Sequence, residues 1–182
     1  MTVFLIALVV LVGVIATVDL LLTVGVIRRL RQHTEQLATL TPPDGPPPSV
    51  MVGVGERVGE FAATTTDGEA MSRDLLSGQT LVGVLSPDCG ACKERLPEFI
   101  SYAGSFPGGR GQVLAVVAGA PDQAEPYRER LAPVARVVIE PPAHGPITTA
   151  LQAQGFPTFA VLDAEGTVVA SDLELTGLPV GV

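Results

Sequence analysis

The chain has 182 residues, of which 47% are hydrophobic and 16% charged, and its 11 Lys and Arg against 19 Asp and Glu give a formal net charge of −8. This length predicts about one domain, and the acidic balance excludes a protein that binds nucleic acid through its phosphate backbone. So few charges among so many apolar residues are unusual for a simple soluble domain, and part of the hydrophobicity is therefore expected in a membrane segment.

Residues 2–27 are an almost unbroken apolar run, interrupted by Thr17, Asp19 and Thr23. As a helix rising about 1.5 Å per residue, this run can cross the roughly 30 Å hydrocarbon core of a bilayer. A cleaved signal peptide would have a basic start and a shorter apolar run, and a core helix hydrophobic all round is unusual in a small domain. We therefore predict an uncleaved single-pass anchor in the cell membrane, surrounded by the lipid bilayer. Asp19 either contacts a partner within the membrane or reaches interfacial water.

Residues 28–54 are predicted to form a juxtamembrane helix and a linker. Arg28, Arg29 and Arg31 follow the anchor, and the positive-inside rule favours the cytoplasm for this side. Residues 32–40 can prolong the anchor helix, whereas the proline-rich stretch 42–48 favours an extended, semi-rigid spacer. Residues 55–182 are then predicted to be the folded domain.

Within residues 55–182, short apolar runs are separated by turn signals. An Asp-Gly turn at 67–68 predicts a β-hairpin over 61–71. Strands that alternate with helices predict an α/β fold, with a sheet covered by helices on both faces. In chain order, we expect a strand at 81–85, a helix after Cys89, a strand at 113–118, a helix at 123–131, an apolar run at 135–139, a short helix at 147–154 and a hairpin of 158–162 with 167–170.

Cys89 and Cys92 are the only cysteines, and they stand where the strand at 81–85 gives way to the helix. With two residues between them, the thiols can close a small disulfide ring. A sulfur at a helix N-terminus is favoured as thiolate by free N–H groups and the helix dipole, which predicts Cys89 as the nucleophile. Cys92, one turn further on, is then the resolving thiol that releases a mixed disulfide.

Two other roles for this Cys-x-x-Cys pair are weaker. Half of a zinc site would need two more ligands, but the only histidines are His33 and His144, so neither a metal nor another cofactor is expected. A purely structural disulfide would not need the junction of a strand and a helix.

Residues 86–93, with Pro97 five positions after the second cysteine, resemble the active-site turn and kinked helix of thioredoxin-fold proteins. Residues 155–159 (Gly-Phe-Pro-Thr-Phe) resemble their cis-proline loop. The segment 58–61, the anchor and the turn at 163–166 resemble the membrane-anchored TlpA-like branch and its AhpC/TSA-type redoxin relatives. The motif Ser-Pro-x-Cys-x-x-Cys-Lys at 86–93 is most similar to that of MauD-like proteins.

This resemblance implies a thioredoxin-like central mixed sheet with flanking helices, preceded by a β-hairpin and a single transmembrane helix. It implies a protein thiol–disulfide oxidoreductase, with a cysteine-containing client protein and a membrane-bound electron donor or acceptor as partners. It places the domain outside the cytoplasm, which we expect despite the arginine cluster. The implied catalytic residues are Cys89, Cys92 and Pro157, and the implied client-binding residues are Phe156, Pro87 and Asp88.

The bond between Phe156 and Pro157 is predicted to be cis rather than part of a simple surface turn, because a strand follows at once. A cis turn would leave backbone groups free to pair with an extended client strand. Asp88 stands where the family has a tryptophan, and Ala91 replaces the usual residue between the cysteines. Whether the protein reduces or oxidises its clients therefore stays open.

Two alternative functions remain. Ser86, three residues before Cys89, is typical of a peroxiredoxin-like thiol peroxidase with antioxidant activity, although Val82 stands where such enzymes have a proline. Two thiols could also hold Cu(I) in a tethered copper chaperone, although no His or Met lies nearby in the sequence.

Overall fold

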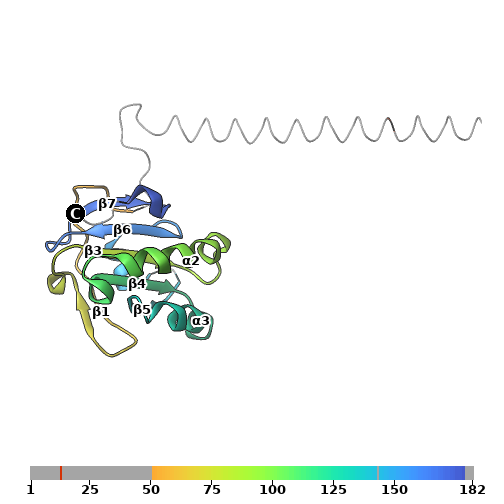
Figure 1. Ribbon diagram of the computed structural model, residues 1–182, viewed down its shortest axis with the longest axis horizontal. Helices are drawn as coiled ribbons and strands as arrows, with labels where there is room; N and C mark the ends of the chain where they lie inside the picture. The colour runs from red at the N-terminus through yellow and green to blue at the C-terminus, as the bar shows by residue number, and fades with distance from the viewer. Residues whose placement is uncertain (1–12, 14–50, 143, 179–182) are drawn as a thin grey trace, which may run out of the picture. The chain divides into compact units, whose positions relative to one another are not determined.

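The computed structural model describes Gly13, residues 51–142 and residues 144–178 (Figure 1). The chain divides into two units, Met1–Pro48 and Ser49–Val182, and the second contains the folded domain. The anchor predicted at 2–27, apart from Gly13, and most of the predicted segment 28–54 lie outside the described residues. Within the described part of the chain, no helix is both long enough and apolar enough to span a membrane.

The domain is built on a five-stranded mixed sheet with the order β5-β4-β3-β6-β7. The parallel strands β3, β4 and β5 pair side by side, and β6 and β7 are antiparallel to their neighbours. Every residue of β3, β4 and β6 is buried, as expected for continuous apolar runs covered on both faces. The mixed α/β sheet is thus confirmed. The strands are β3 (Thr80–Leu85), β4 (Val113–Ala118), β5 (Arg136–Glu140), β6 (Thr158–Leu162) and β7 (Val168–Asp172).

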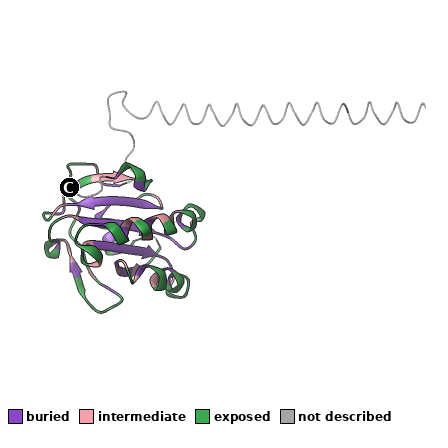
Figure 2. Ribbon diagram, in the orientation of Figure 1, coloured by how far each residue is buried: buried purple, intermediate pink, exposed green. Residues whose placement is uncertain are grey.

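Helices cover both faces of the sheet, and alternate residues of each strand point to opposite cores. Helices α2 (Gly90–Ser105) and α3 (Pro121–Leu131) pack against the face that contains Leu81 and Leu85. The short helix α4 (Pro146–Ala150) and the hairpin of β1 (Ala62–Thr64) and β2 (Ala70–Ser72) lie on the face of Val82 and Val84. Figure 2 shows the central strands buried between elements that expose their outer sides.

The predicted hairpin is confirmed, whereas α4 ends before the predicted limit of 154. Gln152 has a φ of 51°, in the left-handed region, so the chain leaves the helix there. The predicted helix and strand starts elsewhere agree to within about two residues, which is the usual uncertainty of such boundaries.

The segment before the hairpin belongs to the folded domain. Met51 and Val52, which the sequence interpretation assigned to the linker, are 2% and 4% exposed. The backbone of residues 55–58 pairs with the start of β7, where the Gly55 and Val168 N–H groups donate to Val168 O and Glu56 O.

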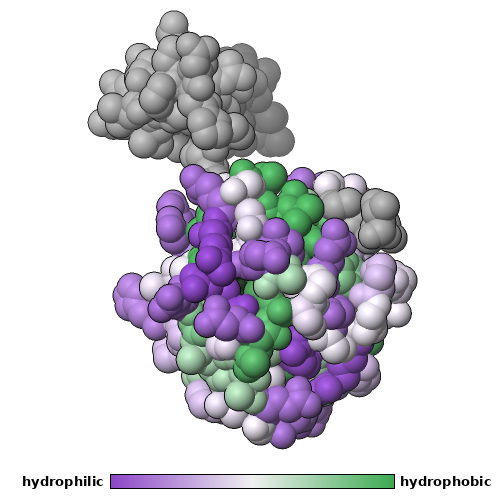
Figure 3. Space-filling model, turned by 90° about the vertical axis from the view of Figure 1, so that its left-hand side faces the viewer, coloured by the Kyte–Doolittle hydropathy of each residue, from purple (hydrophilic) through white to green (hydrophobic). Residues whose placement is uncertain are grey.

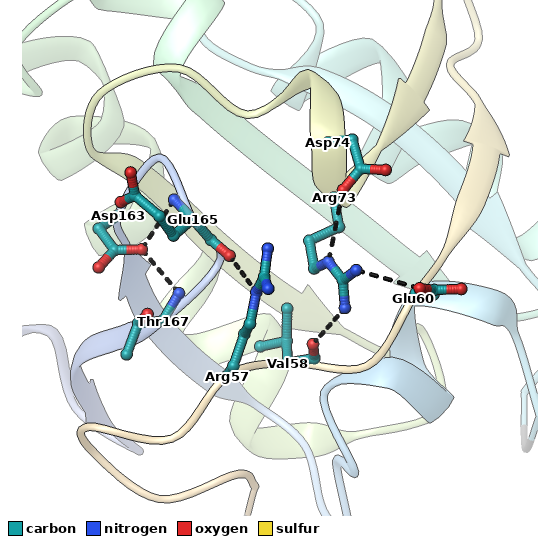
Figure 4. A network of polar contacts seen from close by, with 8 residues as sticks. All are labelled: Arg57, Val58, Glu60, Arg73, Asp74, Asp163, Glu165 and Thr167. Atoms are coloured by element: carbon teal, nitrogen blue, oxygen red, sulfur yellow. Dashed lines mark hydrogen bonds and ion pairs between the residues drawn. The ribbon is translucent and has the colours of Figure 1, made fainter.

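Two arginines fasten this segment (Figure 4). Arg57 Nε donates to Glu165 O over 2.6 Å, and Arg73 donates to Val58 O and to the Glu60 carboxylate. These contacts tie the segment both to the turn between β6 and β7 and to the short 3-10 helix η1 (Arg73–Leu75).

The last described residues, 173–178, form a short segment with one 3-10 turn rather than a long helix. A single 3-10 turn, η3 (Leu175–Gly177), buries Leu175 and Leu178 against the core beneath α2. Glu174 pairs with Arg95 of α2 over 2.7 Å. Among residues 173–178, η3 is thus the one helical element.

Some large apolar side chains stay exposed on this domain, among them Val54 and Leu75. On the face drawn in Figure 3, hydrophobic and hydrophilic surface lie side by side. Scattered exposed apolar residues are ordinary in folded proteins, so they indicate no docking surface by themselves.

Candidate active site

Cys89 is the N-cap residue of α2. Strand β3 ends at Leu85, the Cys89 N–H donates to Ser86 O over 3.2 Å, and the helix begins at Gly90. The Cys89 sulfur accepts a hydrogen bond from the Cys92 N–H over 3.3 Å, as the oxygen of a capping Ser or Asp does. The half-buried sulfur therefore lies at the positive end of the helix, as predicted.

Cys92 lies on the inner side of the same helix turn and is completely buried. Its sulfur accepts a hydrogen bond from the Ser86 N–H over 3.4 Å. Burial, together with the hydrogen bond to Cys89, raises the pKa of the Cys92 thiol to about 12. Both cysteines are free thiols in the structure, but only Cys89 is exposed to a reaction partner.

The loop before β6 forms the wall beside Cys89. The bond between Phe156 and Pro157 is cis, which confirms the prediction. The Cys89 thiol donates to Phe156 O over 3.3 Å, although the two residues are 67 positions apart in sequence. They meet because β6 pairs directly with β3, so the start of β6 lies beside the end of β3. Phe156 is half-buried and Pro157 buried.

Pro87 and Asp88, the remaining predicted client-binding residues, differ in exposure. Asp88 is exposed next to Cys89, whereas Pro87 is buried. A Cβ on Gly119 would lie 2.8 Å from Pro87 Cδ, so the turn between β4 and α3 fits against this proline only with a glycine there. Sequence reasoning missed Gly119, because nothing in the local pattern indicates what it faces.

Sequence reasoning also missed Tyr127, a buried tyrosine of α3 in the same apolar cluster as Cys92. Its signal was present: Ala124, Tyr127 and Leu131 are spaced as one buried helix face.

A peroxiredoxin-like peroxidase would need an activating arginine at Cys89, and a metal site would need further ligands. Of the described arginines, none forms a hydrogen bond with Cys89, and Arg95, the nearest in sequence, is paired with Glu98 and Glu174. Within residues 51–142 and 144–178, no group of three or more His, Cys, Asp and Glu side chains could hold a metal ion.

No protein-family model and no curated protein matches the sequence. Solved structures do match the chain. The thioredoxin domain of a thiol-disulfide oxidoreductase from Bacteroides vulgatus matches with a TM-score of 0.56 at 18% identity, over 69% of this chain and 92% of that one. The domain has the thioredoxin fold.

Two further thioredoxin-fold structures agree with this assignment. A thiol:disulfide interchange protein from Bacteroides sp. has a TM-score of 0.54 at 18% identity, over 68% of this chain and 83% of its own. A thio-disulfide isomerase from Thermus thermophilus has a TM-score of 0.51 at 20% identity, over 66% of this chain and 86% of its own. The expected thioredoxin-like mixed sheet with flanking helices is thus confirmed.

Proposed function

We propose that this protein is a membrane-anchored thiol–disulfide oxidoreductase. Its Cys89–Cys92 pair would undergo thiol–disulfide exchange with cysteines of client proteins. The observation that carries the proposal is the unequal placement of the two thiols, one half-exposed at a helix N-terminus and one fully buried behind it. The names of the similar structures, which are thiol-disulfide oxidoreductases and isomerases, support the same activity.

In the reducing direction, the Cys89 thiolate attacks one sulfur of a client disulfide. The client S–S bond breaks, its other sulfur leaves as a thiolate and takes up a proton, and Cys89 is joined to the client. Cys92 then loses its proton and attacks the Cys89 sulfur, which releases the second client thiol and forms the Cys89–Cys92 disulfide. Two electrons have passed to the client, and the reverse sequence oxidises it.

The client groove is proposed to run past Cys89 between Asp88, Pro87 and the loop of Phe156 and Pro157. Phe156 O lies against the Cys89 sulfur, so a client cysteine joined to Cys89 would lie next to this backbone. A membrane-bound partner would return the domain to its starting redox state.

The proposed anchor at 2–27 would hold the domain at the outer side of the membrane. Protease added to spheroplasts should then digest the domain. Digestion only after cell lysis would place the domain in the cytoplasm, as the arginine cluster suggests.

Insulin reduction by the purified full chain tests the activity. Cys89→Ser should abolish it, and Cys92→Ser should accumulate mixed disulfides, whereas the exposed change Ser101→Ala on the same helix should leave it unchanged. Unaffected reduction in either cysteine variant would overturn the proposal. Rapid peroxide consumption without insulin reduction would instead indicate the peroxidase, and one bound Cu(I) per chain without reduction would indicate the chaperone.

A further inference from the structure

Tyr127 on α3 is 6% exposed, and its hydroxyl has no hydrogen-bond partner among the described residues. A buried hydroxyl without a partner is unfavourable, because it has lost the hydrogen bonds it would make to water. Such groups are rare in native proteins, and one beside reactive side chains suggests a role that appears during the reaction.

The position of Tyr127 relates it to the thiol pair. Helices α2 and α3 cover the same face of the sheet, and Tyr127 belongs to the same buried cluster as Cys92, together with Leu96 and Val117. The strands that lead into the two helices, β3 and β4, are parallel neighbours, so both helices begin at the same end of the sheet. Tyr127 and Cys92 therefore belong to one buried core beneath two helices that begin at the same end of the sheet.

Tyr127 also interacts electrostatically with Cys92 and Cys89. Burial raises the pKa of Tyr127 above its usual range, and negative charge on Cys92 and then Cys89 raises it further, while Arg130 acts in the opposite direction. The phenol therefore stays protonated and can donate. For Cys92, the titratable group that acts on it is Cys89, and the donor already present is the Ser86 N–H.

The resolving step creates a negative charge on the Cys92 sulfur, which the Ser86 N–H stabilises only in part. Before attack, the Cys92 proton must leave a sulfur that is completely buried. A charge in such surroundings needs hydrogen-bond donors, and donors to an ionised group give stronger bonds than neutral pairs do. Among the described residues, the backbone donor that another residue supplies to this sulfur is the neutral Ser86 N–H at 3.4 Å, and a side-chain donor would stabilise the charge further.

We propose that the Tyr127 hydroxyl donates a hydrogen bond to the Cys92 sulfur as it ionises, and thereby promotes the resolving step; this inference rests on the proposed exchange function. In that step Cys92 loses its proton to solvent, and its electron pair forms the bond to the Cys89 sulfur. The bond between Cys89 and the client breaks, and the client sulfur leaves with its electron pair and takes up a proton. Tyr127 keeps its own proton throughout.

The test uses 5,5′-dithiobis(2-nitrobenzoate), a small disulfide whose leaving thiolate is coloured. The chain has two cysteines, so the reduced full chain releases one thiolate when Cys89 reacts and a second when Cys92 displaces the label. Tyr127→Phe should leave the first phase unchanged and slow the second roughly tenfold, which is the usual size of a lost bond to a charged group. The pH profile of the second phase should move upward by about one unit, since a tenfold change corresponds to one pKa unit.

Tyr102→Phe is the matched control, because it removes the hydroxyl of the only other tyrosine. Tyr102 lies ten residues beyond Cys92 on α2, about 15 Å along the helix axis, and its hydroxyl donates to Leu178 O. Both phases should be unchanged in this variant. An unchanged second phase and pH profile in Tyr127→Phe would overturn the proposal.

Stability separates this role from a structural one. Tyr127→Phe removes only an unpartnered hydroxyl, so the free energy of unfolding in urea should stay the same or rise while the second phase slows. A loss of stability together with an equal slowing of both phases would overturn the proposal.

A second variant covers the case in which Tyr127→Phe does not fold. Fluorotyrosine incorporated into the Tyr102→Phe chain labels Tyr127 alone, and its more acidic phenol should speed the second phase. No acceleration would overturn the proposal. Two normal phases without insulin reduction would instead contradict the proposed function, because the small disulfide needs no client groove.

Discussion

Gly83, at the centre of β3, is a position where one added methyl group should disturb the buried core strongly. A Cβ there would lie 2.5 Å from Cε2 and 2.6 Å from Cζ of Phe99. The Phe99 ring is completely buried and stacks on Phe159, with 5.5 Å between the ring centroids. The ring therefore cannot move aside without displacing Phe159, which lies two residues after Pro157 in the loop and strand beside Cys89.

Gly83→Ala should lower the free energy of unfolding by about 3 kcal/mol, at the upper end of the usual range for an overpacked core. The 2.5 Å contact is about 1.0–1.5 Å shorter than the roughly 3.5–4.0 Å at which carbon atoms attract one another. A domain stable by about 5–15 kcal/mol would remain folded, but with a much smaller margin.

Urea unfolding of the full chain in mild detergent, followed by far-ultraviolet circular dichroism, measures this loss; the chain has no Trp for fluorescence. Gly111→Ala is the control, because a Cβ there meets nothing within 4 Å, and it should change stability by less than about 0.5 kcal/mol. Phe99→Leu should be less damaging in the Gly83→Ala background than alone, with a coupling above about 1 kcal/mol. Equal stability of Gly83→Ala and Gly111→Ala, or additive effects with Phe99→Leu, would refute the reasoning.

Two further predictions follow from buried groups. The pKa of Cys92 is about 12 in the folded state against an ordinary 9.0, so the folded state binds its proton more tightly; this contribution to stability is complete below pH 9 and is lost as the pH rises from about 9 to about 12. The unfolding free energy of the reduced chain should therefore fall more steeply with pH above 9 than that of Cys92→Ala, and parallel profiles would contradict the burial argument. The Glu140 carboxylate is 2% exposed and accepts hydrogen bonds from Ile147 N at 2.7 Å, Thr148 N at 3.0 Å and Thr148 Oγ1 at 2.7 Å. Glu140→Ala leaves these donors unpartnered and should lower the urea-unfolding free energy by about 2–4 kcal/mol, with the exposed Glu129→Ala as control; a loss as small as the control's would show that the donors find other partners.

Several elements of the fold could be predicted locally. The apolar runs at 113–118 and 158–162 coincide with β4 and β6, because a strand buried on both faces leaves a continuous apolar run in the sequence. Leu96, Phe99 and Ala103 are spaced as one face of a helix and are buried in α2, whereas Ile100, at the margin of this face, is only half-buried. The early end of α4 was not predictable, because the left-handed conformation of Gln152 has no glycine or proline to announce it.

Some features of the candidate site could likewise be predicted from the sequence, and others could not. The sequence by itself determined that two thiols lie one helical turn apart at a helix N-terminus, because the spacing of Cys89 and Cys92 and the end of an apolar strand are local features. Tertiary structure alone decided that Cys92 is buried while Cys89 is half-exposed, that Phe156 O meets the Cys89 sulfur and that Tyr127 joins the cluster of Cys92. The physical reason is the order of the sheet: β3 lies between β4 and β6, so segments far apart in sequence converge at its end, and no local pattern contains that order.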